Sequence, residues 1–398
     1  MSSRSSGKNR KEEGLGTNKM KKDAMAAYME EALKLAAKAT DRTYPNPMVG
    51  ALIVKSGKVV GAGYHRRAGE PHAEVNAIRE ASAKCRNATL FVTLEPCDHF
   101  GKTPPCTEAV ISSGIKEVVI AMRDPNPLNS GRGIRRLKKA GITVITGILE
   151  QEAKYFNRKY IKYITEDLPY VTLKLAQSVD GKIAARNGTS RWISSETSRA
   201  AVRKMRKVYD AIMVGAGTVA KDDPLLLAEE GKSSRTVRVI VDSRLRIFQT
   251  AKVIKTAKKS PVIIGTTELA PAGKIKKLNA LPNVEVVVQK SKKGRVPLRS
   301  FLKELAGKGI VNILSEGGGE LSGSLLDESL ADEAIFFIAP ILLGGEASSV
   351  KGKGVSDISK AISLEDVSIR PSGGDIFLRG RISKKGIGKR QVKKCSRG

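Results

Sequence analysis

The chain contains 398 residues and carries a formal net charge of +31, with 40% hydrophobic and 4% aromatic residues. A chain of this length is expected to form two domains, each large enough to bury its own core. It has no apolar run near the roughly 18 residues that a membrane span requires, and no apolar segment of the signal-peptide kind. Its four cysteines are too few for a disulfide framework. We therefore exclude membrane-spanning and disulfide-rich secreted proteins and expect a cytoplasmic chain.

Most of the positive charge lies in three stretches. Residues 1–23 carry seven Lys or Arg against three acids, residues 384–398 carry seven against none, and residues 251–300 carry twelve against two. Basic surfaces of this kind are solvated and attract phosphorylated small molecules. Because aromatic residues are few and are not interleaved with the basic ones, we expect no specific nucleic-acid partner. Weak binding of RNA or DNA by the tails at low salt stays open.

The first half of the chain alternates helices and strands. Residues 1–23 lack apolar periodicity and are expected to be a disordered basic tail, and residues 384–398 are a second basic tail. The apolar spacing then predicts, in order, a helix over 25–39, strands over 49–54 and 58–63, a helix over 72–83, a strand over 90–94, a helix over 107–113, strands over 118–120 and 142–145, and a helix over 152–163. This alternation is typical of an α/β sandwich, which we place at residues 24–168.

Four residues of this half form a pattern typical of a zinc deaminase. His72 opens one predicted helix, Cys97 lies just past the end of a predicted strand, and Cys106 directly precedes the next predicted helix. One imidazole and two thiolates give zinc three ligands and leave a fourth position for water, whose pKa bound zinc lowers towards about 7. Glu74, two residues after His72, is suited to relay a proton without binding the metal. Two ligands near the starts of neighbouring helices are expected to face each other across one cleft.

Other readings of these residues stay open from the sequence. His99 could complete a closed structural zinc site, although Glu74 would then have no role. The two cysteines could also form a redox pair. Chance is a poor explanation, because two of the three histidines and three of the four cysteines fall between positions 72 and 106. Cys85 and Cys395 are expected to be free thiols.

The second half, residues 169–383, repeats the alternation with different motifs. Apolar runs predict strands over 170–176, 211–215, 238–241, 262–265, 284–288 and 311–314, with a helix over 195–208. The last of these strands leads into Glu316-Gly317-Gly318-Gly319. A glycine cluster between a strand and a helix lets backbone amides approach a phosphate, although a simple tight turn is the alternative. The glycine spacing is not the dinucleotide-binding fingerprint of a Rossmann fold.

The motifs together resemble one enzyme family. The first half is similar to the cytidine-deaminase-like fold, but eight residues separate Cys97 from Cys106, where cytidine and tRNA adenosine deaminases typically have two. This gap and the loop Pro45–Gly50 resemble the deaminase of riboflavin biosynthesis. The second half resembles the dihydrofolate-reductase-like reductase of the same pathway in four segments: Leu173–Lys182, Ser190–Ser194, Gly217–Pro224 and Glu316–Gly319. The resemblance to this bifunctional deaminase–reductase family runs from about residue 25 to residue 383.

The resemblance implies two consecutive reactions with Zn²⁺ and NADPH as cofactors. The first is the hydrolytic deamination of 2,5-diamino-6-(5-phosphoribosylamino)pyrimidin-4(3H)-one, and the second is the reduction of the ribosyl group to ribityl. A homo-oligomer is implied in the same way. Two alternatives stay open: a deaminase whose reductase-like half is not catalytic, and a nucleic-acid deaminase.

The family pattern also implies the contacts of each ligand. Those to NADPH are Ala176, Trp192, Thr218, Asp222, Ser243, Gly318, Gly319, Glu320, Leu321, Ser322, Gly323 and Ser324. Those to the substrates are Asn46, Lys174, Ser190, Arg206, Leu226 and Glu316. From the residues alone, Trp192 could equally be core packing, Asp222 a turn cap and Arg206 plain surface.

One position departs from the family pattern. Relatives usually place an arginine five residues after the proline of Asp222-Asp223-Pro224, where it helps to bind the substrate phosphate. This chain has Glu229 there, and a carboxylate facing a phosphate is expected to repel it. Lys232 or Arg235 could replace the lost charge if the loop shifts.

Overall fold

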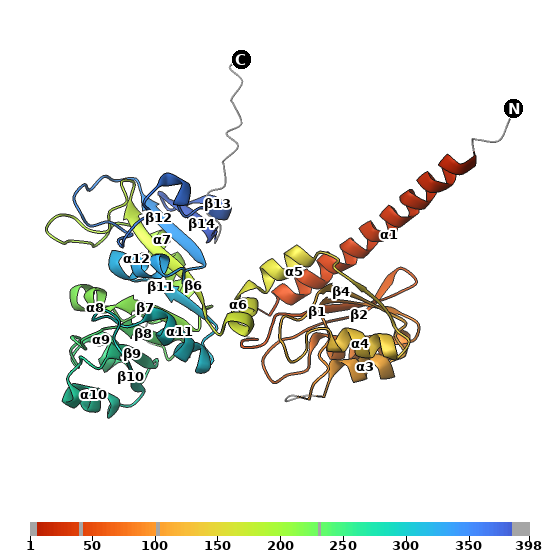
Figure 1. The fold of residues 1–398 in the computed structure, drawn as a ribbon, viewed down its shortest axis with the longest axis horizontal. Helices are drawn as coiled ribbons and strands as arrows, with labels where there is room; N and C mark the ends of the chain where they lie inside the picture. The colour runs from red at the N-terminus through yellow and green to blue at the C-terminus, as the bar shows by residue number, and fades with distance from the viewer. Residues whose placement is uncertain (1–5, 40–42, 101–103, 230–231, 384–398) are drawn as a thin grey trace, which may run out of the picture. The chain divides into compact units, whose positions relative to one another are not determined.

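The computed structural model describes residues 6–39, 43–100, 104–229 and 232–383. The chain divides into two compact units, Met1–Glu166 and Asp167–Gly398, which are coloured red to yellow and yellow to blue in Figure 1. The boundary lies two residues before the predicted one at residues 168 and 169. Within the described ranges, no helix is long and apolar enough to cross a membrane.

Unit 1 contains one five-stranded sheet in the order β2-β1-β3-β4-β5. Its strands are β1 (Gly50–Lys55), β2 (Lys58–Tyr64), β3 (Thr89–Leu94), β4 (Glu117–Met122) and β5 (Thr143–Thr146). The strand β1 pairs antiparallel with β2 and β3, and β3, β4 and β5 run parallel. The helices are α1 (Ser6–Ala37), α2 (Ala73–Ala81), the 3₁₀ turn η1 (Ser82–Cys85), α3 (Cys106–Ser112), α4 (Arg132–Lys139), α5 (Glu150–Phe156) and α6 (Arg158–Glu166).

Glycines show how the helices of unit 1 cover both faces of its sheet. A Cβ atom on Gly50 would lie 2.0 Å from the Ala32 carbonyl oxygen of α1, whereas one on Gly63 would lie 2.3 Å from the Ala73 carbonyl oxygen of α2. Gly63 pairs with Ala51, and neighbouring residues of a strand point to opposite faces. The helices α1 and α2 therefore lie on opposite faces, which gives the expected three-layer sandwich.

Three helices of unit 1 differ from the sequence prediction. The helix α1 begins at Ser6. From Ser6 onward the structure therefore has a helix where the sequence predicted disorder up to residue 23. A lack of apolar periodicity argues against a buried helix face but does not exclude a helix. The predicted helix over 152–163 is divided at Asn157 into α5 and α6. The helix α4 was not predicted, because its sequence RGIRRLKK places only Leu137 and Gly133 in the buried interior.

Unit 2 contains a nine-stranded sheet in the order β10-β9-β8-β7-β11-β6-β12-β14-β13. Its strands are β6 (Tyr170–Ser178), β7 (Ala211–Gly215), β8 (Val237–Val241), β9 (Val262–Thr267), β10 (Val284–Gln289), β11 (Asn312–Ser315), β12 (Glu333–Ala339), β13 (Leu364–Ser372) and β14 (Asp375–Ile382). The helices are α7 (Glu196–Arg206), α8 (Ala216–Asp222), α9 (Lys252–Lys255), α10 (Ala272–Asn279), α11 (Leu298–Gly307), α12 (Gly319–Asp327) and the 3₁₀ turn η2 (Ile358–Lys360).

The seven strands from β10 to β12 are parallel, whereas β14 pairs antiparallel with both of its neighbours, β12 and β13. Sequence analysis placed no strand after residue 314. The apolar run of β12 does not distinguish a buried strand from a buried helix, and β13 is exposed along almost its whole length. Because parallel strands end at one edge of the sheet, this edge is where a ligand site is expected.

Candidate active sites

The predicted zinc ligands come together in unit 1. The His72 Nδ1, Cys97 Sγ and Cys106 Sγ atoms all lie within 4.8 Å of one another. The distance from His72 Nδ1 is 3.1 Å to Cys106 Sγ and 3.6 Å to Cys97 Sγ. Tetrahedral zinc with its usual bond lengths holds nitrogen and sulfur ligands about 3.5 Å apart, so these three side chains fit a zinc ion. His99 does not belong to the cluster, which leaves the closed four-ligand site without support in the described part of the chain.

Local structure explains how the ligands meet. His72 is the N-cap residue of α2, with an extended backbone at φ −72° and ψ 167°, and Cys106 is the first residue of α3. Cys97 follows the end of β3 and receives a hydrogen bond from the Cys106 backbone N–H at 3.3 Å. The helices α2 and α3 pack together. The prediction that two ligands open two neighbouring helices is correct.

Glu74 lies beside the ligands without being one of them. It stands in the first turn of α2 with 3% of its surface exposed. Burial raises the pKa of Glu74 to about 7, partly offset by the nearby His72, and its carboxylate accepts a hydrogen bond from Cys106. Hydrogen bonds from Cys106 and His72 lower the pKa of the Cys97 thiol, which favours the thiolate that a metal requires.

Sequence analysis missed the residue that anchors the Cys97 segment. Glu95 is buried between β3 and Cys97, and its carboxylate accepts three backbone N–H groups, from Asp124 at 3.1 Å, Gly131 at 3.0 Å and Ile134 at 3.2 Å. These donors lie more than 25 residues away in the sequence, so no short motif reveals them. The loop before α4 is thereby fixed against the ligand-bearing segment.

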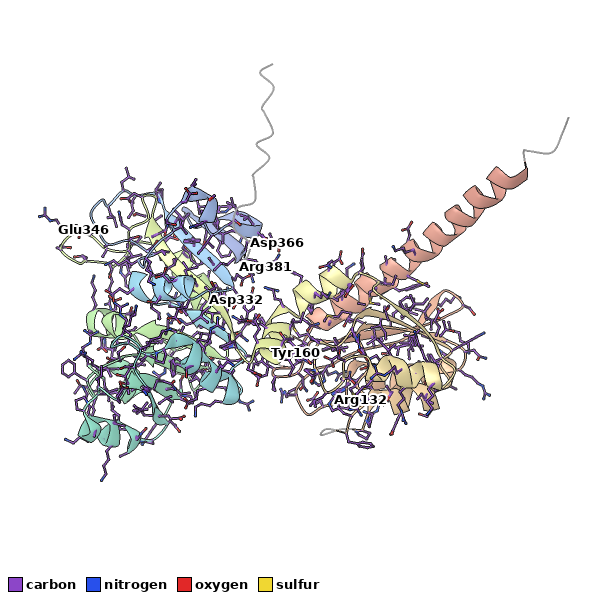
Figure 2. The ribbon with its side chains drawn as sticks, viewed as in Figure 1. Arg132, Tyr160, Asp332, Glu346, Asp366 and Arg381 are labelled. Carbon is purple, nitrogen blue, oxygen red and sulfur yellow. The ribbon has the colours of Figure 1, made fainter. Side chains whose placement is uncertain are left out.

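A second missed group extends this anchor. The Asn129 side chain accepts the Asp98 N–H at 2.9 Å and donates to Asp124 Oδ2 at 3.1 Å. The Tyr160 hydroxyl donates to Asp124 Oδ1 at 3.1 Å, and Tyr160 is labelled on α6 in Figure 2. Burial raises the pKa of Asp124. Cys97 is thus held by a chain of buried hydrogen bonds that reaches α6.

The predicted substrate residue Asn46 lies on a loop that is held from two sides. Its amide nitrogen is 3.3 Å from His65 Nε2, and the His65 ring meets the His72 ring edge-on at 5.1 Å. The buried Asn157 side chain accepts the Met48 N–H at 2.9 Å and donates to the Met48 carbonyl at 3.1 Å. Neither His65 nor Asn157 was identified from the sequence. Asn157 lies 109 positions from Met48, so no short motif connects the two residues.

In unit 2, an open cleft of about 1410 Å³ lies where the parallel strands end. Every residue predicted to contact the reductase substrate lines it: Lys174, Ser190, Arg206, Leu226 and Glu316. So do ten of the predicted NADPH contacts: Ala176, Trp192, Thr218, Asp222, Ser243, Gly318, Gly319, Glu320, Leu321 and Ser324. Ser322 and Gly323 do not, because both are buried within α12, where a Cβ atom on Gly323 would overlap the Lys351 carbonyl oxygen.

An ion pair joins two of the residues that line this cleft. Arg206 Nε and Nη2 donate to the two Glu316 carboxylate oxygens at 2.6 and 2.9 Å, and the two side chains are 18% and 9% exposed. Arg206 is therefore not plain surface. Burial lowers the pKa of the neighbouring Lys174, and the charge of Glu316 opposes this effect. The three charged side chains come from β6 (Lys174), the last residue of α7 (Arg206) and the residue after β11 (Glu316).

Comparisons with known proteins agree with both sites. The model of the cytidine and deoxycytidylate deaminase zinc-binding region matches residues 22–122, and that of the RibD C-terminal domain matches residues 169–378. The riboflavin biosynthesis protein RibD of Aquifex aeolicus is 42% identical over 88% of this chain and 96% of its own length. The Bacillus amyloliquefaciens protein of the same name is 42% identical, over 88% and 94%.

The chain belongs to the RibD family. The structure of Acinetobacter baumannii RibD matches 91% of this chain and all of its own with a TM-score of 0.78 and 34% identity. A Thermotoga maritima deaminase/reductase covers 91% and 99%, with the same TM-score and 37% identity. The chain is accordingly a bifunctional enzyme of riboflavin biosynthesis, a zinc-dependent deaminase joined to an NADPH-dependent reductase.

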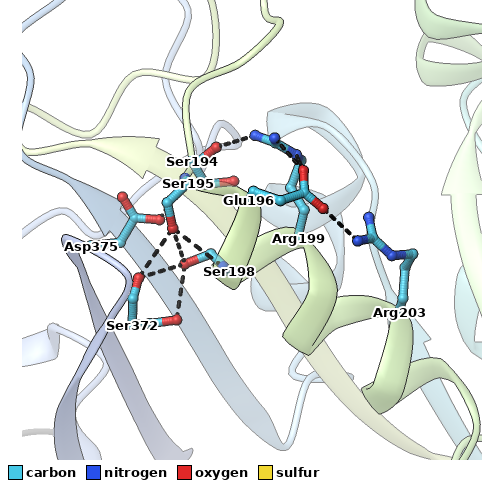
Figure 3. Close-up of polar contacts among 8 residues, drawn as sticks. All are labelled: Ser194, Ser195, Glu196, Ser198, Arg199, Arg203, Ser372 and Asp375. Atoms are coloured by element: carbon cyan, nitrogen blue, oxygen red, sulfur yellow. Dashed lines mark hydrogen bonds and ion pairs between the residues drawn. The ribbon is translucent and has the colours of Figure 1, made fainter.

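In this RibD chain, Trp192 is not a core residue. Its side chain is 69% exposed and carries the Arg199 guanidinium 4.3 Å above the ring centroid. Arg199 also donates to the Ser194 carbonyl and pairs with Glu196, as Figure 3 shows. The tryptophan therefore stands at the cleft wall, available to a ligand.

The turn that follows Trp192 is fastened to the last two strands. Ser195 caps α7 by accepting the Ser198 N–H, and its own N–H donates to Asp375 at 2.8 Å. The Ser195 and Ser198 hydroxyls both donate to the Ser372 carbonyl at 3.1 Å, in the network of Figure 3. The β13–β14 hairpin thus helps to fix one wall of the RibD cleft.

A buried arginine supports the loop that carries Leu226. Arg238 on β8 has none of its surface exposed and donates to the Leu225 carbonyl at 3.0 Å and the Thr256 hydroxyl at 2.7 Å. Leu226 itself has a left-handed backbone with φ at 54°. Burial lowers the pKa of Arg238 to about 10. Sequence analysis did not identify Arg238, because a single polar residue within an apolar strand gives no sign of its role.

Glu229, which replaces the arginine usual in relatives, forms ion pairs with two lysines. Its carboxylate pairs with Lys207 at 3.0 Å and with Lys232 at 2.6 Å. Both lysines lower the pKa of Glu229, with the hydrogen bond from Lys232 as the larger cause. Glu229 also does not line the cleft. The repulsion expected from this carboxylate is therefore cancelled by two cations.

Proposed function

We propose that unit 1 deaminates 2,5-diamino-6-(5-phosphoribosylamino)pyrimidin-4(3H)-one and that unit 2 reduces the ribosyl group of the product. The observation that carries the proposal is the cluster of His72, Cys97 and Cys106 within 4.8 Å, with the Glu74 carboxylate buried beside it. The Thermotoga maritima relative is named for the corresponding deaminase and reductase.

In the deamination, we assign zinc to His72, Cys97 and Cys106. Bound zinc would supply a water molecule acidic enough to react at neutral pH. The Glu74 carboxylate is placed to take a proton from water and to give it to the amino group. The ring carbon then gains a bond to the water oxygen and loses its bond to nitrogen, which leaves as ammonia. Asn46, held by His65 and by the loop that Asn157 clamps, orients the pyrimidine ring.

In the reduction, NADPH supplies the hydride. The protein has to align the nicotinamide with the sugar carbon and hold the phosphate. We assign alignment to Ala176 and Trp192 and the cofactor phosphates to the amino end of α12, which Gly318 opens without a side-chain cap. Lys174 and Arg206, with Glu316 fixing the arginine, bind the phosphorylated substrate.

The proposal is tested by following the loss of NADPH absorbance when zinc-loaded protein receives the undeaminated pyrimidine. NADPH consumption is expected, because the reductase needs the deaminated product. No consumption from either pyrimidine would overturn the reductase assignment, whereas consumption from the deaminated product alone would overturn the deaminase assignment. The same two outcomes separate this function from a deaminase with an inactive second half.

We also propose a homo-oligomer, formed through the edge of the second sheet. The edge strand β13 is exposed on both faces and, with β14, presents Val367, Ile369 and Ile376 at 49%, 65% and 48% exposure. Exposed apolar edge strands invite pairing with another strand. Analytical ultracentrifugation of the wild type and of Ile369→Lys is the test: a monomeric wild type would contradict it.

A cytoplasmic location and the absence of a specific nucleic-acid partner complete the proposal. Zinc thiolates and the free, buried Cys85 suit a reducing compartment. A titration with single-stranded RNA at increasing salt is expected to show weak binding without sequence preference. Tight binding of one sequence at high salt would contradict this part.

A further inference from the structure

The two cysteines of the zinc site are separated by a long loop. Eight residues lie between Cys97 and Cys106, so the chain itself does not keep the two thiols close together. Both thiolates must nevertheless reach the same ion. Closing a loop costs conformational entropy that rises with the number of residues in it. Bonds between protein groups that keep this loop closed would therefore favour the binding of zinc.

Three hydrogen bonds join the residues around Cys97 to those around Cys106. The Cys106 N–H donates to Cys97 Sγ at 3.3 Å, and the Thr107 N–H donates to the Cys97 carbonyl at 3.2 Å. The Thr107 hydroxyl donates to Asp98 Oδ1 at 2.7 Å. The first two bonds use backbone N–H groups at the start of α3, which almost any residue would provide. The third bond depends on two side chains that are not metal ligands.

The bond between Asp98 and Thr107 is short and shielded from water. Thr107 has none of its surface exposed, and the Asp98 side chain is 17% exposed. The acceptor is a carboxylate, and hydrogen bonds to carboxylates are shorter and stronger than those between neutral groups. Because little water can compete for either partner, this bond contributes more than an exposed one would.

The Asp98 side chain is fixed by two other segments. The Asn129 side chain accepts the Asp98 N–H at 2.9 Å, and Arg136 Nε on α4 lies 3.3 Å from Asp98 Oδ1. The helix α4 lies tightly against the cysteine-bearing segment, since a Cβ atom on Gly133 would be 2.0 Å from the Pro96 carbonyl oxygen. The carboxylate is therefore held in place independently of its bond to α3.

We propose that Asp98 and Thr107 form a clasp that closes the loop between the two cysteine ligands, which makes both of them positioning residues for zinc. The clasp joins protein atoms to each other, so it holds Cys97 and Cys106 together whether or not the ion is bound. Groups outside the ligand set commonly change metal affinity by about ten- to a hundredfold. The clasp acts on zinc affinity and not on the chemistry of deamination. This inference rests on the proposed assignment of zinc to His72, Cys97 and Cys106.

The test is the dissociation constant for zinc, measured on the full chain by competition with a chelator of known affinity. Thr107→Val keeps the size of the buried side chain and removes its hydroxyl, so the constant is expected to rise about ten- to a hundredfold. Asp98→Ala, at a partly exposed position, is expected to give a similar rise and tests the same bond if Thr107→Val does not fold. Thr107→Ser keeps the hydroxyl and is expected to stay within about twofold of the wild type.

Two further measurements separate a positioning role from a general loss of stability. Co²⁺ accepts the same nitrogen and sulfur ligands as zinc, and its thiolate complexes absorb light. In Thr107→Val, this absorption is expected to need more Co²⁺ than in the wild type and to reach the same final spectrum. At saturating zinc, deamination is expected to return to within about twofold of the wild-type rate, because excess metal restores occupancy of the site.

The matched control is Glu108→Gln. Glu108 follows Thr107 on α3 and also pairs with Arg136, at 3.7 Å, but this ion pair includes no residue of the Cys97 segment. An equal loss of zinc affinity in the control would overturn the clasp, and so would unchanged affinity in both Thr107→Val and Asp98→Ala. Deamination that stays low at saturating zinc would also overturn it, because the two residues would then act on the reaction.

Failure of the metal site itself would look different. A wild type that binds no zinc would overturn the proposed ligand set, and so would a Cys97→Ala protein that binds zinc as tightly as the wild type. Tight zinc binding by the wild type together with unchanged affinity in the clasp variants would leave the ligand set standing and overturn the clasp alone.

Discussion

The two active sites of this protein differ in how many residues form them and in how far apart those residues lie. The zinc site draws its donor atoms from residues 72 to 106 and holds them within 4.8 Å of one another. The reductase cleft draws its walls from residues 174 to 353 and encloses about 1410 Å³. A metal ion bonds directly to a few atoms, whereas a dinucleotide is recognised by many weaker contacts spread over several loops. Single substitutions are therefore expected to abolish deamination but to weaken reduction by degrees.

The largest expected effect is at Cys97. The Cys97→Ala substitution leaves two zinc ligands, so the protein is expected to lose bound zinc and all measurable deamination. Reduction of the deaminated pyrimidine is expected to continue, because Cys97 belongs to the other unit. Metal analysis and the two separate assays check this. Retained stoichiometric zinc would show that the ligand set is wrong.

The next effect is at Glu74. Glu74→Gln keeps the size of the side chain but cannot carry the proton, so deamination is expected to fall by about 10²- to 10⁴-fold. Zinc content is expected to stay the same. The matched control is Glu108→Gln, which changes an exposed glutamate in the first turn of α3. Zinc loss in the Glu74 variant would make Glu74 a ligand.

In the unit 2 cleft, Arg206→Met is expected to act on stability and on reduction together. It leaves the nearly buried Glu316 without its partner, which is expected to cost about 3 kcal/mol in the free energy of unfolding of unit 2. The KM for the deaminated pyrimidine is expected to rise while deamination stays normal. Chemical denaturation with both assays measures this. Normal stability would mean that the ion pair contributes little.

A smaller effect on the deaminase side is expected from Asn157→Leu. The substitution leaves the N–H and the carbonyl of Met48 unpaired, which is expected to lower the free energy of unfolding of unit 1 by about 2 kcal/mol in total. Because the same loop carries Asn46, the KM for the undeaminated pyrimidine is expected to rise with kcat less affected. Asn157→Asp, which keeps the acceptor for the Met48 N–H, is expected to lie between. Identical kinetics in all three proteins would remove the proposed positioning role.

The smallest effect is expected at Glu229. Glu229→Gln frees Lys207 and Lys232, so the KM for the phosphorylated reductase substrate is expected to fall by no more than about threefold. The difference is expected to vanish at high salt, because all three side chains are exposed. A rise in KM would show that Glu229 supports binding instead of opposing it.

The same contrast explains what the sequence could and could not predict. His72, Glu74, Cys97 and Cys106 were identified from their spacing, because zinc ligands must be of a few residue types at fixed distances. The cleft residues came from the family resemblance, since no spacing rule connects Lys174 with Ser243.

The supporting residues were found only in the structure. Glu95, Asn157 and Arg238 act through backbone groups of distant segments, and a backbone partner leaves no mark in the sequence. The edge strand β13 was missed for another reason: it is exposed along almost its whole length, so no buried apolar run marks it.

The pairing of Glu229 with two lysines has a consequence for how this surface can evolve. Lys207, Glu229 and Lys232 together keep one net positive charge, the same sign that a lone arginine would give. Restoring an arginine at position 229 alone would bring three cations together, whereas losing one lysine alone would leave the patch neutral. The three positions are therefore expected to change as a set, so that the effect of a substitution at one depends on the residues present at the other two.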